Sequence, residues 1–260
     1  MTRVFTFFAV AVLAMSAAAA NAGVILEQEI VINGQTAGGA SKRTIVIEGH
    51  KQKVTTSRHS VITDLDRGVV ILLIPARKMY TEMPFPPTDP SGKMMQDAEV
   101  KASFKKTDKQ KTLNGYQCVE YVGSGRLMMA DFTVTGCFSK DAPGAAEYTA
   151  YDKALETKLN GTSTATQGSR PEGVPLITER ATRIRLASIP GLTPEQAKQM
   201  ANQPPHTTTT RTTSVKVATL PADTFTVPAG YTKSEPRKGR HLGAPTGGPG
   251  KPGALPKVTE

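Results

Sequence analysis

The sequence predicts a mainly β protein of the α+β class, built around one mostly antiparallel sheet. Three observations predict this fold. Short apolar runs of β-type residues alternate with Gly, Pro, Asn and Asp over much of the chain, a pattern typical of strands joined by tight turns. Only a few segments show helical periodicity or helix caps. The length of 260 residues suits a single domain with extra terminal segments.

The first strands are expected in quick succession after the N-terminal segment. They cover residues 24–32, 43–48, 53–58, 61–65, 69–74 and 78–83. Asp66, Arg67 and Gly68 predict a compact turn, with Gly where a positive φ costs little. The 69–74 run is almost continuously apolar, so we expect it inside the sheet and covered on both faces.

A disulfide is expected in the middle of the chain. Two strands should cover residues 116–123 and 126–138. If they pair across a turn at Ser124 and Gly125, then Cys118 and Cys137 lie at the open end of the hairpin. An isolated pair in an exported protein is most simply a disulfide, which stabilises the fold by about 3 kcal/mol. The alternative, a reactive thiol pair, would favour a C-x-x-C spacing, which the sequence does not contain.

The clearest predicted helix covers residues 145–160 and stops at Gly161. Its apolar side chains recur at three- and four-residue spacing: Tyr148, Tyr151, Leu155 and Leu159. Such a stripe indicates core packing rather than a ligand site. A short helix is also expected over residues 91–100.

A second well-marked helix should start at Thr193, with Pro194 in its first position and Gln196 completing a capping box. This helix and the 145–160 helix can together cover one face of the sheet. The remaining strands are expected over 175–186 and 207–219, and the segment 220–231 closes the domain with Phe225, Val227 and Tyr231.

The two ends of the chain predict export and a loose tail. Arg3, an apolar run and the small residues Ala20, Asn21 and Ala22 are typical of a cleavable signal peptide over residues 1–22. The alternative is an uncleaved membrane anchor. We expect a periplasmic or secreted protein that is not an integral membrane protein after cleavage. Gly23 would follow the cut, so lipoprotein anchoring is excluded.

The domain is therefore expected over residues 23–233, followed by a disordered, basic tail rich in Pro and Gly over residues 234–260.

A basic strip lies just before the disulfide segment. Its lysines are Lys101, Lys105, Lys106, Lys109 and Lys111. One interpretation is contact with an anionic envelope component, such as lipid phosphate. The other is an edge strand whose lysines prevent aggregation. The formal net charge is +10, but export argues against nucleic acid as a partner.

No catalytic, cofactor or metal site is predicted. The four histidines, His50, His59, His206 and His241, share no metal-ligand spacing. Asp64 and Asp66 sit at a turn, where Asp commonly binds backbone N–H groups, and no partner for acid–base chemistry is evident. We therefore expect a protein that is not an enzyme and needs no cofactor.

The order of several segments resembles a known group of proteins. These segments cover residues 64–66, 75–80, 113–121 and 223–231, and include G-Y-x-C-x-x-Y at 115–121 and F-x-V-P-x-G-Y at 225–231. Over residues 24–233 the chain resembles an uncharacterised family of exported bacterial proteins similar to the LolA/LolB-like lipoprotein carriers. The resemblance implies an incomplete β-barrel, a curved antiparallel sheet whose concave face is covered by helices.

Two functions follow as expectations. In the first, the concave face binds a lipid, a lipidated protein or another apolar ligand, as in the carriers; no ligand-contacting positions can be matched to theirs. In the second, the protein is a cell-envelope interaction or stress-response module, whose lysine strip and tail bind anionic partners.

Overall fold

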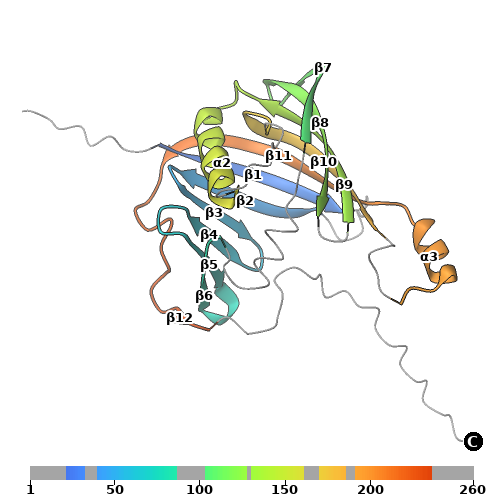
Figure 1. The fold of residues 1–260 in the computed structure, drawn as a ribbon. Coiled ribbons are helices and arrows are strands. Elements are labelled where there is room, and N and C mark those ends of the chain that lie inside the picture. The colour runs from blue at the N-terminus through green and yellow to red at the C-terminus, as the bar shows by residue number, and fades with distance from the viewer. Residues whose placement is uncertain are drawn as a thin grey trace, which may run out of the picture.

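The computed structural model describes residues 22–32, 40–86, 103–127, 130–160, 170–185 and 191–235. These residues form one 12-stranded sheet that is open and curved, with a helix lying across it (Figure 1). The predicted class, mainly β with a few helices, is confirmed. The strand order is β12-β6-β5-β4-β3-β2-β1-β11-β10-β9-β8-β7.

The first arm of the sheet contains the strands that follow the N-terminal segment. They are β1 (Ala22–Ile32), β2 (Ser41–Glu48), β3 (Lys51–Thr56), β4 (Ser60–Asp64), β5 (Val69–Ile74) and β6 (Met79–Pro84). A 3-10 turn, η1 (Pro75–Arg77), joins the last two. β5 lies inside this arm, between β4 and β6, as its apolar run predicts.

The second arm contains β7 (Ser103–Leu113), β8 (Tyr116–Leu127), β9 (Ala130–Ser139) and β10 (Val174–Ile184). The turn expected at Ser124 and Gly125 is wrong, because both residues are inside β8 and pair with Thr133 and Phe132 of β9. Glycine in a strand interior misled the prediction, because glycine is also found within strands and does not by itself mark a turn.

The two arms meet at strands from opposite ends of the chain. β11 (His206–Thr219) pairs with β1 along its whole length and also with β10, both antiparallel. Residue Ala22, directly before the predicted cleavage point, pairs with Thr219. The rest of the predicted signal peptide, the 91–100 helix and the tail beyond residue 235 lie outside the described residues.

Helix α2 (Ala145–Asn160) has the predicted bounds and packs against β1, β2 and β10. We call the face of the sheet against which it packs the inner face. Leu26 and Ile45 on this face belong to the main core together with Tyr151, and Tyr148 and Leu155 pack against that core. The predicted aromatic stripe is thus core packing, although Leu159 at its end is 37% exposed.

A second core lies on the outer face of the first arm. Val54 pairs with Val61 on the inner face, so the next residue, Ile62, points outward. Ile62, Ile71 and Leu73 are buried there under the C-terminal segment, whose packing residues are Phe225, Val227 and Tyr231. The closing role predicted for this segment is confirmed. It ends in β12 (Thr232–Lys233), which pairs parallel to β6.

Helix α3 (Pro194–Ala201) starts at Thr193 with the predicted capping box, in which Thr193 and Gln196 exchange hydrogen bonds. The expectation that it helps to cover the sheet is wrong. None of its residues is buried, and it lies beyond the ends of β10 and β11, away from α2 (Figure 1). Its sequence has too few apolar residues to bury a face.

Candidate functional site

The lysine strip lies on β7, the edge strand of the second arm. Lys105, Lys106, Lys109 and Lys111 are all exposed, and Lys101 lies outside the described residues. The interpretation as a lysine-protected edge strand therefore agrees with the position of β7 at the end of the strand order.

Strand register divides these lysines between two surfaces. Lys106 is opposite Tyr121 of β8, whereas Lys105 is opposite Val122, so their side chains leave opposite faces of the sheet. A register shift between Lys106 and Gln110 interrupts the alternation further along. The strip therefore does not form one continuous basic surface.

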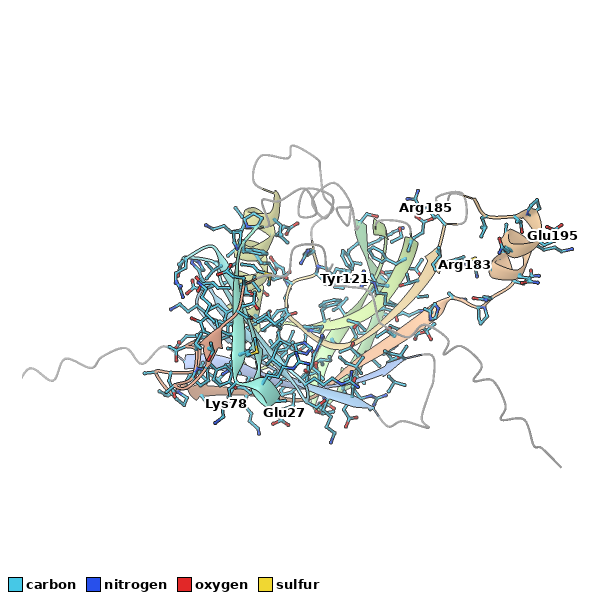
Figure 2. All side chains as sticks on the ribbon, turned by 90° about the horizontal axis from the view of Figure 1, so that it is seen from below. Glu27, Lys78, Tyr121, Arg183, Arg185 and Glu195 are labelled. Carbon is cyan, nitrogen blue, oxygen red and sulfur yellow. A yellow bond between two sulfur atoms is a disulfide. The ribbon has the colours of Figure 1, made fainter. Side chains whose placement is uncertain are left out.

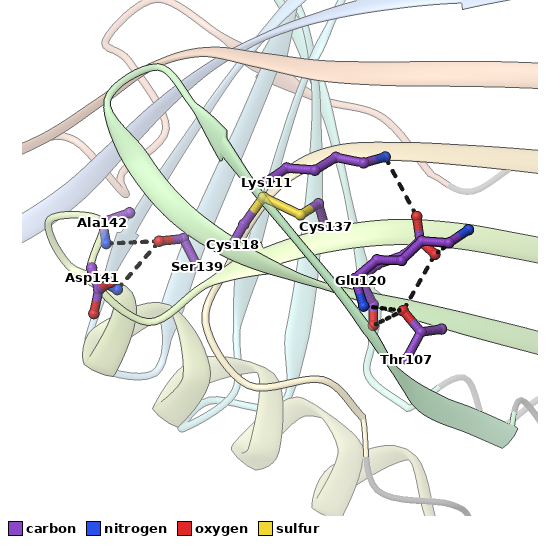
Figure 3. The surroundings of a disulfide bond; sticks show 9 residues. Thr107, Lys111, Cys118, Glu120, Cys137, Ser139, Asp141 and Ala142 are labelled. Carbon is purple, nitrogen blue, oxygen red and sulfur yellow. Dashed lines mark hydrogen bonds and ion pairs between the residues drawn. A yellow bond between two sulfur atoms is a disulfide. The ribbon is translucent and has the colours of Figure 1, made fainter.

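Two of its lysines are already paired within the protein (Figure 3). The Nζ atoms of Lys109 and Lys111 each lie 3.4 Å from a carboxylate oxygen of Glu120, whose side chain is buried. Thr107 Oγ1 donates to the same carboxylate at 3.3 Å. Burial opposes ionisation of Glu120, but the two ammonium groups outweigh it, and its pKa lies below the ordinary value. Glu120 thus neutralises part of the strip.

The disulfide predicted between Cys118 and Cys137 is present (Figure 3). The Cα atoms are 5.4 Å apart. Cys137 is opposite Glu120, which is two residues from Cys118 on β8, so the two cysteines are diagonal neighbours on β8 and β9. Both are fully buried in the main core, a position that supports a structural role.

The histidines and aspartates near the turns have structural partners. His50 Nδ1 lies 2.7 Å from Asp66 Oδ1, with both side chains exposed. Asp64 Oδ1 accepts a hydrogen bond from the backbone N–H of Arg67 at 3.0 Å, so the turn-capping role belongs to Asp64. His59 contacts Thr56 within a turn. Within the described segments no cluster of His, Cys, Asp or Glu could hold a metal ion.

A shallow surface depression of about 420 Å³ lies beside the N-terminal half of α2. Alanines of the helix line it together with Lys140, Lys153 and Glu172. Glu172 accepts from both lysines at 2.7 Å. Hydrogen bonds from Lys140 and Lys153, with their positive charges, lower the pKa of Glu172 to about 2. The charged groups of the depression thus satisfy one another.

A different surface gathers aromatic side chains on the second arm. Phe104, Tyr121, Phe132 and Phe138 lie on one face of β7, β8 and β9, and we call this set the aromatic face. Phe132 is 5% exposed and the other rings are half-buried. Tyr121 and Phe138 pack edge to face with centroids 5.7 Å apart, an arrangement that adds to the burial energy.

The aromatic face is continuous with the inner face. Gln28, beside Leu26 and Ile45 on the inner face, pairs with Thr212 of β11. Two residues along β11, Thr210 pairs with Thr178 of β10. Thr178 pairs with Gly136, which pairs with Tyr121. Figure 2 accordingly shows Tyr121 between the two arms of the sheet. A ligand on the aromatic face would therefore lie on the same face as α2.

Two glycines make room for the rings of Phe104 and Phe138 against the backbone. A Cβ at Gly123 would be 2.7 Å from Cδ1 of Phe104, and a Cβ at Gly136 would be 2.6 Å from Cε2 of Phe138. Both distances are shorter than atoms in contact allow, so only glycine admits the rings. Phe104 and Phe138 can therefore pack closely against the strand backbone.

Polar groups occupy the centre of the inner face. Arg43 Nε donates to Gln28 Oε1 at 2.7 Å, Gln28 Nε2 donates to Thr212 Oγ1 at 3.0 Å, and Thr212 donates to the carbonyl of Pro175 at 2.6 Å. Burial lowers the pKa of Arg43, and the nearby Tyr148 opposes that effect. The chain of hydrogen bonds satisfies Gln28 and Thr212, both buried.

Tyrosines of α2 complete this polar centre. Burial raises the pKa of Tyr148, with the Asp152 carboxylate acting in the same direction. Burial likewise raises the pKa of Tyr151 to about 12. Both groups stay neutral hydroxyls at any physiological pH, so neither is suited to act as a base.

Sequence reasoning missed the aromatic face. The lysine strip is visible in the sequence because its members are close together. The four rings come from three strands, and only the strand register brings them together. The available signal was glycine at 123 and 136, inside segments that otherwise read as strands, beside aromatic residues on neighbouring strands.

Comparisons with known proteins do not assign the chain to a family. No family model matches the chain, and no curated protein matches it. Among solved structures, one described as "Structure of PNGF-II in C2 space group" is similar with a TM-score of 0.40 and 12% identity. The match covers 83% of this chain and 31% of that chain, so the protein spans less than a third of its length. A likeness this weak carries no argument about fold family or function.

Among the described helices, neither α2 nor α3 is long and apolar enough to cross a membrane.

Proposed function

We propose that the protein is a non-enzymatic, exported binding protein whose inner face holds the apolar part of a lipid, a lipidated protein or a similar ligand. The aromatic face is the observation that carries this proposal. Three of its rings are only half-buried, although they lie on the face that elsewhere forms the core under α2. Half-buried rings gathered on one surface are typical of binding sites for apolar groups.

The fold supports the proposal through the shape of the sheet. The sheet is curved and open, and α2 packs against its middle strands β1 and β2. The aromatic face lies toward the other end of the strand order, on β7 to β9. Similarity to the LolA/LolB-like carriers is part of the proposal, since a curved sheet covered by a helix is what that resemblance implies.

The test measures ligand binding by the full exported protein. Protein isolated from the envelope fraction is extracted with organic solvent, and mass spectrometry identifies any acyl-containing molecule that co-purifies. The same protein is titrated with a fluorescent acyl probe that has a neutral headgroup. The chain contains no tryptophan, so no indole emission interferes with the probe.

Two variants of adjacent residues localise the binding. Tyr121→Ser removes a ring from the aromatic face, and we expect probe affinity to fall about tenfold, from the apolar area of one aromatic side chain. Val122→Ser is the matched control, because Val122 is 42% exposed and lies on the opposite face of β8. Equal affinity in Tyr121→Ser and the unaltered protein, with no acyl compound in the extract, would contradict the proposal.

A further inference from the structure

Cationic side chains flank the aromatic face on two sides: Lys106 of β7 lies opposite Tyr121, and Arg180 of β10 is stacked on Phe132. Arg180 of β10 pairs with Val134 and Thr208, and its guanidinium carbon lies 4.4 Å from the ring centroid of Phe132. The side chain is half-buried, and this burial lowers its pKa. Stacking on a ring holds the guanidinium plane in place while its N–H groups point outward from the edge of the plane.

Arg180 has no acidic partner among the described residues, in contrast to two arginines outside the strands. Arg67 pairs with Glu82 at 3.3 Å and Arg170 with Asp152 at 3.0 Å. Among the described residues, no carboxylate lies within 4.0 Å of Arg180, and no hydrogen bond to its guanidinium is formed. A partly desolvated cation without a counter-charge is costly to a fold. Such a group is favourable where an external anion supplies the missing charge.

The strand register places this cation in line with the apolar surface. From Arg180, one row across the sheet passes through Val134 and Gly123 to Phe104. Three strand spacings of roughly 4.8 Å make this row about 14 Å long. Phe132 and Tyr121 lie on the same face in the two neighbouring rows, and Phe138 lies in the row beyond Tyr121. The apolar row thus runs from Arg180 on β10 to Phe104 on β7, where the exposed Lys106 lies two residues further along the same face.

We infer that the ligand is a single-chain lipid with an anionic headgroup, bound with its headgroup at the guanidinium of Arg180 and its chain across the aromatic face. This inference rests on the proposed function and adds the charge and the orientation of the ligand. Carboxylate and phosphate both fit the fork of an arginine, so either headgroup meets this requirement.

The experiment compares headgroups on one chain length. The full exported protein, freed of lipid, is titrated calorimetrically with dodecanoate, dodecyl phosphate and dodecanol below their aggregation concentrations. The two variants are Arg180→Gln and its control Arg183→Gln. Arg183 is exposed, lies three residues further along the same strand and points from the opposite face.

We expect both anionic probes to bind the unaltered protein at least tenfold more tightly than dodecanol. Arg180→Gln should weaken both anionic probes about ten- to a hundredfold, the range for hydrogen bonds to charged groups, and leave dodecanol unchanged. Arg183→Gln should bind all three like the unaltered protein. A preference for phosphate over carboxylate would identify the source of the headgroup.

Three results would overturn the inference. These are equal affinity for dodecanol and the anions, undiminished anion binding by Arg180→Gln, or a loss that affects dodecanol to the same extent. In all three cases an apolar ligand still binds, so the proposed function stands. Failure of every probe to bind the unaltered protein contradicts the proposed function itself.

Discussion

The ring of Phe104 lies directly over the backbone of Gly123 on the neighbouring strand, so close that a Cβ at Gly123 would be 2.7 Å from ring carbon Cδ1 and 3.0 Å from Cγ1 of Val134. Gly123→Ala should therefore destabilise the fold by about 1–3 kcal/mol, the usual cost of forcing an extra methyl into a packed site. Urea unfolding of the two proteins measures the difference.

The partner ring provides the control. In a Phe104→Ala background the same Gly123→Ala change should cost clearly less, because the obstructing ring is gone. Equal costs in the two backgrounds would show that Phe104 does not restrict the residue at position 123.

Removing the disulfide should weaken the fold without abolishing the sheet. The cross-link joins residues 19 apart in sequence, and Cys118→Ala with Cys137→Ala should lower the free energy of unfolding by about 3 kcal/mol. Thermal unfolding with and without reductant measures this effect. The double variant should be insensitive to reductant, while the unaltered protein should approach it when reduced.

Acid should weaken the fold through Glu172. Because its pKa is about 2 in the folded protein against an ordinary 4.5, the folded state binds a proton less readily than the unfolded chain. The stabilisation is fully present above about pH 4.5, declines as the pH falls and is lost near pH 2. Glu172→Gln should reduce stability at pH 7 and flatten the dependence between these values.

Glu156→Gln is the control for the change in charge. Glu156 lies on α2, and within the described part of the chain its carboxylate forms no ion pair. Unfolding measured from pH 2 to pH 7 should match the unaltered protein for this variant. An unchanged acid profile in Glu172→Gln would contradict the role given to its bonds with Lys140 and Lys153.

The second expected function, binding of anionic envelope partners, is tested by shortening the C-terminus. Ser234 still donates its backbone N–H to Tyr80 at 2.7 Å, so the deletion should begin at residue 236. Salt-sensitive sedimentation with anionic vesicles should fall if the basic tail binds them. Binding of the neutral acyl probe and the unfolding midpoint should not change. Undiminished sedimentation would contradict a role for the tail.

Local features of the fold were predictable because they depend on residues that are close together in the sequence. The helix over residues 145–160 follows from its apolar spacing and its glycine stop, and the Thr193 capping box from four consecutive positions. The hairpins of the first arm follow in the same way, since alternation and short turns bring their members together. The disulfide follows from its being a lone cysteine pair, although the turn expected between its strands was wrong.

Features made by distant strands were not predictable. The aromatic face needs the register of β7, β8 and β9, and the prediction of a turn at Ser124 and Gly125 had cut β8 short. The unpaired state of Arg180 depends on the absence of a carboxylate nearby in space, which no run of sequence displays. The pairing of Lys109 and Lys111 with Glu120 was hidden for the same reason.

The outer core of the first arm has a consequence for biogenesis. Ile62, Ile71 and Leu73 are made early, but Phe225, Val227 and Tyr231, which shield them from water, are among the last described residues to leave the ribosome. Until then these three apolar side chains of the nascent chain remain exposed to solvent, and exposed apolar surface promotes aggregation. Holding chaperones should therefore associate with released chains that end before Leu220 and not with released chains that include Ser234, as co-precipitation of the two truncated forms would show.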